Sequence, residues 1–112
     1  MLDALTSVES HGSGTAVSPK GALGSTQLMP ATAKEMAGKL GLPFRPDMLQ
    51  SNTSPALSYQ RALAGAYLKE GLSKTGNLTD ALHYYHGGPD RAQWGPKTHA
   101  YANAVLSRLG GM

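Results

Sequence analysis

The aliphatic side chains of this 112-residue chain are strongly biased towards two types. The chain has fifteen Leu and fifteen Ala, but only three Val and no Ile. Pleated sheets favour β-branched residues, whereas Ala and Leu carry little penalty in an α-helix. The bias therefore predicts a mainly α fold, and a chain of this length predicts a single domain over residues 1–112.

The absence of Cys excludes a disulfide framework, a thiolate nucleophile and a cysteine-ligated metal centre. No apolar run approaches the roughly 18–20 residues that a membrane span needs. The start Met1-Leu2-Asp3 also lacks the basic residues of a secretory signal. We therefore expect no membrane span and no signal peptide, and we expect the chain to be part of a larger protein or to be delivered by another device.

The net charge of +3 comes from scattered Lys and Arg residues rather than from a basic run or stripe. Such a mild excess suits any polyanionic surface, but it is too diffuse to indicate a nucleic-acid partner. Acid–base chemistry that needs a carboxyl group has seven candidates: Asp3, Glu9, Glu35, Asp47, Glu70, Asp80 and Asp90.

Apolar spacing together with Pro, Gly and capping residues predicts five helices. They are a short helix ending near Ser10, one from Pro30 to Gly41, one capped by Ser54, one capped by Asn77 or Thr79 and ended by Gly87-Gly88, and one from Pro96 to Gly110. The stretch from Ser13 to Ser25 is poor in charge and rich in Gly and Ser. It predicts an ordered loop with a small hairpin through residues 16–18 and 22–24.

Three segments carry most of the functional information. The first runs from Glu9-Ser10 through Ala16-Val17-Ser18 and Gly21-Ala22-Leu23-Gly24 to Gln27-Leu28-Met29-Pro30-Ala31-Thr32-Ala33; the second is Ala81-Leu82-His83-Tyr84-Tyr85-His86-Gly87-Gly88-Pro89, and the third is Thr98-x-x-Tyr101. In order and spacing they closely resemble the soluble lytic transglycosylase catalytic domain, a goose-lysozyme-like group of enzymes that cleave peptidoglycan. The resemblance covers residues 9–101 and implies a lysozyme-like (α+β) domain of about five helices.

Carried over by position, the resemblance makes Glu9 the catalytic acid and base. It makes six further residues ligands of the glycan strand: Ser18, Gln27, Met29, Tyr85, His86 and Tyr101. It implies cleavage of the β-1,4 bond between N-acetylmuramic acid (MurNAc) and N-acetylglucosamine (GlcNAc), with a 1,6-anhydro ring closing in place of attack by water. Neither a metal nor a cofactor is implied, and the partner is the glycan strand of peptidoglycan.

The residues around Glu9 support this role independently. Glu9 lies in the last turn of its expected helix, where the helix macrodipole disfavours a charged carboxylate. The neutral, Gly-rich loop beside it favours the protonated form that a general acid needs. Ordinary glycoside hydrolysis uses two carboxyl groups, yet residues 10–34 contain none. A one-carboxylate mechanism fits that absence.

Three departures from the family pattern stand out. His86 occupies the position of the usual Asn, Lys97 replaces a common Glu, and His11-Gly12 replaces Gly-Phe. The amino-acid sequence around Gly87-Gly88-Pro89 and Trp94 is similar to that of versions of this domain found in bacteriophage virion proteins. We therefore expect a domain of a larger virion or cell-wall-associated protein that acts in the periplasm or cell wall.

Two other functions remain open. One is a lysozyme-type hydrolase of the same fold, with Asp90 or a positioned water supplying the second function. The other is a wall-binding module in which Glu9 is idle. Tyr85 and Tyr101 also suit half-buried core positions, and Trp94 suits either sugar stacking or packing. His83, His86 and His99 lack a familiar ligand spacing, so no metal site is predicted.

Overall fold

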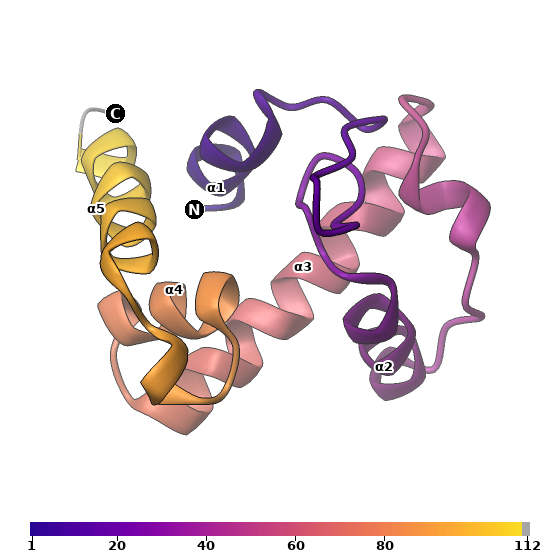
Figure 1. Cartoon of the computed structure of the whole chain (residues 1–112). Helices are drawn as coiled ribbons and strands as arrows, with labels where there is room; N and C mark the ends of the chain where they lie inside the picture. Colours follow the sequence, from indigo (N-terminus) through magenta and orange to yellow (C-terminus); the bar gives the residue numbers. More distant parts are fainter. Residues whose placement is uncertain (111–112) are drawn as a thin grey trace. The chain divides into compact units, whose positions relative to one another are not determined.

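The computed structural model describes residues 1–110, with side chains for residues 1–109, so the last two residues of the predicted domain lie outside the described part. The described chain forms five α-helices and two short 3-10 helices (Figure 1). In chain order they are α1 (Leu2–Ser10), α2 (Pro30–Leu40), η1 (Pro46–Leu49), α3 (Ser54–Thr75), α4 (Leu78–Gly87), η2 (Arg91–Gln93) and α5 (Pro96–Gly110). The predicted mainly α fold of about five helices is confirmed, whereas η1 and η2 were not predicted from the sequence.

The chain divides into two compact units. The first unit comprises Leu2–Ala66, and the second begins at Tyr67 and also includes Met1. Helix α3 contributes residues to both units. The first unit therefore holds α1, the following loop, α2 and η1, and the second holds α4, η2 and α5.

Pro and Gly residues set most helix ends as predicted. Pro30 opens α2, and Gly41, with a left-handed φ of 70°, closes it by donating its N–H to Ala37 O and Gly38 O. Asn77 caps α4 by accepting a hydrogen bond from Asp80 N, and Gly88 ends that helix with a φ of 85°. Glycine adopts these φ values without a Cβ clash, which is why it recurs at helix C-termini.

The predicted cap of α3 is wrong by one residue. Ser54 is already the first helical residue, and the side chain of Thr53 accepts the hydrogen bond from Ala56 N at 3.3 Å. Thr53 O also accepts from Leu57 N at 2.9 Å. Both Ser and Thr are good N-caps, so residue type alone does not show which of the neighbouring Thr53 and Ser54 caps the helix.

The loop that follows α1 contains β-bridges rather than a hairpin of two strands. Val17 pairs with Leu23, and Leu23 pairs with Leu28, each as an isolated antiparallel bridge. Ser18 N donates to Ala22 O at 2.9 Å and Gly24 N donates to Ala16 O at 2.8 Å. The predicted hairpin positions thus face each other, but no strand longer than a bridge forms among the described residues.

Each unit has its own apolar core. The buried apolar residues of the first unit are Ala4, Leu5, Leu28, Ala33, Met36, Ala37, Leu49, Ala56, Leu63 and Ala64. Those of the second unit are Tyr67, Ala81, Leu82, Tyr84, Tyr85, Tyr101, Ala102 and Val105, where α4 packs against α5. Small Ala side chains allow close helix contact, so the Ala and Leu bias of the sequence reappears as the core.

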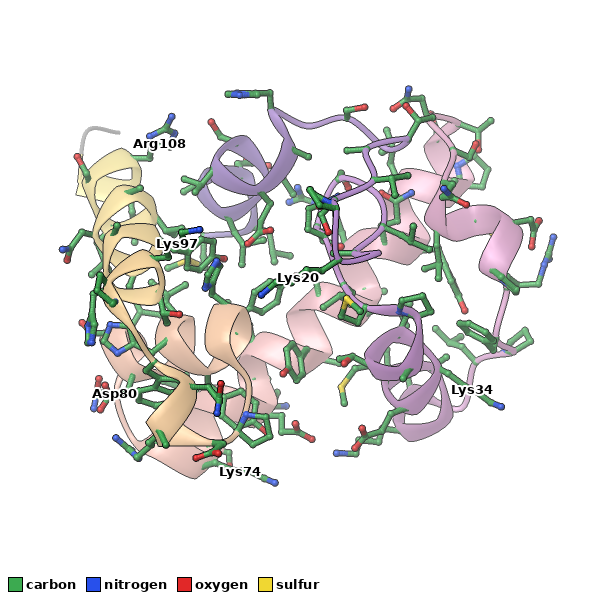
Figure 2. The ribbon with its side chains drawn as sticks, viewed as in Figure 1. Lys20, Lys34, Lys74, Asp80, Lys97 and Arg108 are labelled. Atoms are coloured by element: carbon green, nitrogen blue, oxygen red, sulfur yellow. The ribbon has the colours of Figure 1, made fainter. Side chains whose placement is uncertain are left out.

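Charged side chains are contributed by several elements of the described chain. Basic side chains come from the loop (Lys20), α2 (Lys34), α3 (Lys74) and α5 (Lys97 and Arg108), as Figure 2 shows. Among the described residues, no helix combines the length and apolar character that crossing a bilayer demands.

Candidate functional site

Glu9 lies in the last turn of α1 and its side chain is partly buried. The helix ends at Ser10, because His11 adopts a left-handed φ of 56° and Gly12 a φ of 83°. Gly12 N then donates to Thr6 O at 3.2 Å, and His11 N donates to Ser7 O at 3.2 Å. The predicted acid is therefore carried by a tightly closed helix end.

Ser10, the residue after Glu9, joins this helix end to the following loop. Its hydroxyl donates to Ser25 O at 2.7 Å, lies 3.3 Å from Thr6 O, and accepts from Gly12 N at 3.1 Å. The Ser10–Ser25 bond joins residues fifteen positions apart. The Glu-Ser pair of the sequence motif thus combines a candidate acid with a side chain that fixes its surroundings.

Ser18 lies in the bridge-containing loop. Its hydroxyl oxygen accepts from Ala22 N at 2.9 Å, which leaves the hydroxyl hydrogen to donate elsewhere. The Ser18 side chain is partly exposed. A hydroxyl that already accepts one bond is oriented, and an oriented donor suits a carbonyl oxygen such as that of an acetamido group.

Gln27 has a second left-handed backbone in this loop, with a φ of 53°. Its side-chain amide donates to Gly24 O at 2.8 Å and to Ala16 O at 3.1 Å. Both hydrogens of the amide therefore hold the loop in place, and the amide oxygen is the part of the side chain that can accept a hydrogen bond from a ligand. The resemblance indicated a sugar-orienting role, to which the structure adds that of a loop brace.

Met29 is the residue before α2, and 43% of its surface is exposed. Its neighbour Leu28 is buried, at 4% exposed. An exposed thioether next to a buried core residue is available to contact a ligand, whereas a core-filling Met would be covered.

Gln60 lies on the apolar face of α3, and the sequence did not identify it as a functional residue. It is 1% exposed, and its side-chain oxygen accepts from Ser25 N at 2.8 Å and from Ser25 Oγ at 2.7 Å. Its side-chain nitrogen lies within hydrogen-bond distance of Met48 O, Ser51 O and Gly14 O. A polar residue on the apolar face of a predicted helix is the signal that could have found it.

The remaining carboxylates of the first unit are exposed and ion-paired. Asp3 pairs with Arg61 at 2.9 Å, Glu35 with Lys39 at 3.4 Å, and Asp47 with Arg45 at 2.9 Å. The hydrogen bond from the Arg45 guanidinium holds the pKa of Asp47 below its ordinary value.

The second unit brings together its three predicted ligands. Tyr85 and Tyr101 are 6% and 7% exposed, and their rings stack at 6.5 Å with an interplanar angle of 7°. The exposed imidazole of His86 stacks on Tyr101 at 4.7 Å, and its Nδ1 lies 3.0 Å from Thr98 Oγ1. Thr98 and Tyr101 of the third motif thus hold His86 at the end of α4.

The turn after α4 is packed by Trp94. Its indole N–H donates to Gly88 O at 2.8 Å, and a Cβ on Gly87 would meet its ring at 2.7 Å. The Arg91 guanidinium lies 4.7 Å from the centre of the same ring. Of the two interpretations of Trp94, the structure supports packing under the Gly-Gly turn.

His83 and Asp90 have local partners in the second unit. His83 Nδ1 lies 3.1 Å from Asp80 Oδ1, and its ring contacts His99 edge-on at 4.4 Å. Asp90 caps η2 by accepting from Ala92 N at 3.0 Å. Among residues 1–110, no three His, Asp or Glu side chains are arranged to hold a metal ion.

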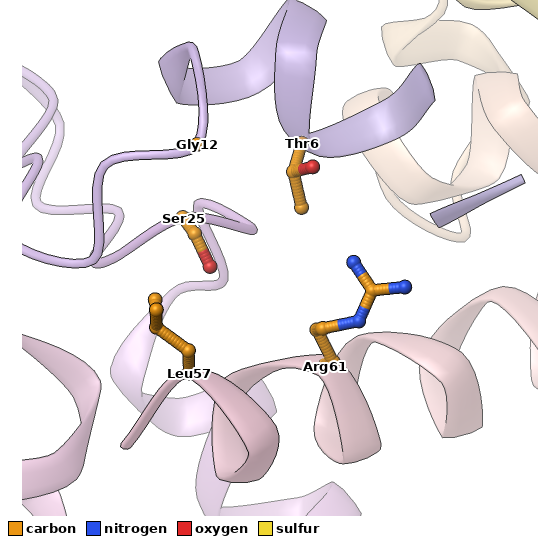
Figure 3. A pocket seen from close by; sticks show the side chains of 5 residues that line it. All are labelled: Thr6, Gly12, Ser25, Leu57 and Arg61. Carbon is orange, nitrogen blue, oxygen red and sulfur yellow. The ribbon is translucent and has the colours of Figure 1, made fainter. Parts of the chain in front are cut away.

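A pocket of about 180 Å³ lies in the first unit, lined by Thr6, Gly12, Ser25, Leu57 and Arg61. Figure 3 shows Arg61 extending from α3 towards Thr6 of α1, with Ser25 and Leu57 on the other side. None of the predicted glycan ligands, and not Glu9, lines this pocket. The pocket therefore marks the junction of α1, loop and α3 rather than the predicted site.

Comparison with known proteins bears directly on the motif resemblance. The sequence model of a family described as the Transglycosylase SLT domain matches residues 1–106. A protein described as "Transglycosylase", from Enterobacteria phage PRD1, is 35% identical over 109 residues, which are 97% of this chain. The match covers 36% of that relative, so the chain spans about a third of its length. The family resemblance of the three motifs is confirmed, and the chain belongs to the Transglycosylase SLT domain family.

Proposed function

We propose that this chain is a peptidoglycan lytic transglycosylase that cleaves the β-1,4 bond from MurNAc to GlcNAc, with Glu9 as its acid and base. The observation that carries the proposal is the family match over residues 1–106, which includes all three motifs. The relative's printed name, "Transglycosylase", agrees with the same reaction class. The closed end of α1 supports Glu9 as the acid, because it carries the carboxyl group beside the motif loop.

The reaction needs one carboxyl group used twice. The Glu9 carboxyl gives its proton to the glycosidic oxygen while the bond from the muramic C1 to that oxygen breaks. The substrate's own N-acetyl oxygen stabilises the cationic sugar. The C6 hydroxyl of the same sugar then bonds to C1, and its proton returns to the Glu9 carboxylate. No water is consumed, and the product ends in a 1,6-anhydro ring.

Six residues bind the glycan in this proposal. Ser18 donates its oriented hydroxyl to the acetamido oxygen, Gln27 offers its side-chain oxygen, and Met29 offers apolar contact. Tyr85, His86 and Tyr101 supply a stacked aromatic group with polar edges. His86 is exposed whereas Tyr85 and Tyr101 are 6% and 7% exposed, so His86 presents its imidazole to the sugar and the two tyrosines back it as a stacked group. The proposal includes no metal and no cofactor.

The site of action follows from the substrate. A glycan-cleaving domain acts in the periplasm or cell wall, and the phage relative supports a place in a larger virion or cell-wall-associated protein. The scattered basic side chains suit a polyanionic wall.

The test is Glu9→Gln, assayed by release of soluble fragments from purified peptidoglycan. Loss of the only proton donor and acceptor is expected to lower turnover by about 10²–10⁴-fold, while binding to intact peptidoglycan persists. Glu35→Gln is the matched control, because Glu35 is an exposed carboxylate that pairs with Lys39 on the surface of α2. Equal release by wild type and Glu9→Gln would refute the assignment of Glu9 as the acid, whereas binding without release by either form would favour an idle wall-binding module.

A further inference from the structure

Gln60 is a buried primary amide in the middle of α3, and its hydrogen bonds reach well beyond that helix. Burying an amide costs free energy unless its donors and acceptor are satisfied. Here the oxygen accepts two bonds, both from Ser25, at 2.8 and 2.7 Å. The nitrogen has Met48 O at 2.9 Å, Ser51 O at 3.1 Å and Gly14 O at 3.3 Å. One side chain therefore ties two loops to α3.

The connection continues from Gln60 to the end of α1. Ser25 N and Oγ donate to Gln60, so the carbonyl of Ser25 is left to accept from elsewhere. It accepts the Ser10 hydroxyl hydrogen at 2.7 Å, whereas the same hydroxyl oxygen lies farther from Thr6 O, at 3.3 Å. Ser10 follows Glu9 directly and is the last residue of α1. All members of this Gln60–Ser25–Ser10 chain lie within the first compact unit.

The packing around the chain leaves little room for adjustment. Gly24, next to Ser25, has a φ of 78°, and a Cβ there would meet Leu49 O at 2.5 Å and the Gln60 side chain at 2.8 Å. A Cβ on Gly14 would clash with Ser51 O. The loop backbone therefore lies directly on the Gln60 amide, and a change of that amide must move the loop.

We propose that Gln60 is a positioning residue for Glu9, acting through Ser25 and Ser10 to fix the end of α1 against the loop that carries Ser18 and Gln27. The inference rests on the proposed function, because it assumes that Glu9 is the acid. Catalytic groups must be held to within about 0.5 Å of their productive position, and a shift of about 1 Å costs up to about 100-fold in rate. A satisfied buried amide provides that rigidity better than an apolar side chain, because it restrains direction as well as distance.

The first test breaks the connection at its partly exposed end. Ser10→Ala removes the bond to Ser25 O and leaves every hydrogen bond of Gln60 intact. We expect kcat to fall about tenfold, with KM for peptidoglycan fragments changed by less than about twofold. Ser10→Thr keeps the hydroxyl and is expected to restore kcat. Ser58→Ala, at an exposed position of α3, is the matched control.

The second test asks whether Gln60 acts through Ser10. Gln60→Met keeps the length of the side chain and removes its polar atoms, and is expected to lower kcat per folded molecule by about 10–100-fold. In the double variant with Ser10→Ala, the two losses are expected to overlap rather than multiply, because both changes release the same helix end. If Gln60→Met does not fold, Ser25→Ala takes its place, since it removes one of the two bonds to the Gln60 oxygen.

The outcomes separate this inference from the proposed function. Wild-type kcat per folded molecule in Ser10→Ala, failure of Ser10→Thr to restore it, or fully multiplicative losses in the cycle would each overturn the positioning role. Full activity of Glu9→Gln would instead overturn the proposed function. Loss of activity that only follows the unfolded fraction, and disappears when the variants are assayed fully folded, also overturns the positioning role.

Discussion

His11 and Gln27 adopt the left-handed backbone conformation at two points of the segment that follows Glu9, with φ values of 56° and 53°. This conformation costs a residue with a Cβ about 1–2 kcal/mol relative to right-handed backbone. Gln27 recovers the cost through two side-chain hydrogen bonds to loop carbonyls. His11 is exposed, and the family pattern usually has Gly at its position. Both residues have a left-handed backbone, but the two side-chain hydrogen bonds that offset its cost are those of Gln27.

His11→Gly is expected to stabilise the protein. Removing the Cβ relieves the left-handed strain, and the greater backbone entropy of unfolded Gly offsets part of the gain. We expect the free energy of unfolding to rise by about 0.5–1 kcal/mol, measured by urea denaturation. His11→Ala is the control, because it keeps the Cβ and the strain. Equal stability of the two variants would contradict the strain argument.

The sequence proposes site residues where a motif resembles a known family, and it misses a residue that acts where a loop packs on a buried side chain. The proposed roles of Glu9, Ser18 and Gln27 come from that resemblance. Gln60 was missed, because helical periodicity predicts that it is buried but not which carbonyls surround it. Its partners Met48 and Ser51 lie in a connection whose path depends on tertiary packing.

At the scale of secondary-structure elements, helix ends were the most predictable feature. Pro30, Gly41 and Gly88 act through backbone conformation alone, so their effect on the helix ends is local and can be predicted from the sequence. The short helices η1 and η2 are single turns whose hydrogen bonds depend on their surroundings, and the loop bridges form without full strands. Local signals therefore predict long helices better than short turns.

The N-terminus of α4 provides a test at this scale. Asn77 Oδ1 accepts from Asp80 N at 2.8 Å, while Asn77 Nδ2 donates to Asp80 Oδ2 at 3.0 Å. Asn77→Ala removes both bonds and is expected to lower the free energy of unfolding at neutral pH by about 1 kcal/mol. Thr79→Ala, on the exposed surface of the same helix turn, is the control. An unchanged unfolding midpoint in Asn77→Ala would contradict the reciprocal cap.

The same turn predicts a pH dependence. The side-chain hydrogen bond from Asn77, assisted by His83 and Arg91, lowers the pKa of Asp80 below its ordinary value. A depressed folded-state pKa means that this stabilisation is fully present above the unfolded pKa and is lost as the pH falls through the folded pKa. Asp80→Asn is therefore expected to reduce the loss of stability below about pH 4, measured by urea denaturation at several pH values. An identical acid profile in wild type and Asp80→Asn would contradict this assignment.

At the scale of the whole molecule, the motifs are distributed over both compact units. Glu9, Ser18, Gln27 and Met29 belong to the first, and Tyr85, His86 and Tyr101 to the second. The length of the chain predicted one domain. Length does not show that the chain divides into two compact units within α3, between Ala66 and Tyr67. The family match runs across both units, from residue 1 to residue 106. Because the chain spans about a third of the phage relative, its activity is best measured on this chain directly.

The most direct test of the central claim is to digest purified peptidoglycan with this protein in ¹⁸O-labelled water and to analyse the fragments by mass spectrometry. The proposed mechanism closes the muramic C6 oxygen onto C1 and consumes no water. It predicts 1,6-anhydro ends, lighter than reducing ends by one water molecule, without ¹⁸O. Reducing muramic ends that carry one ¹⁸O atom would show attack by solvent water, and they would contradict the transglycosylase reaction in favour of a lysozyme-type hydrolase.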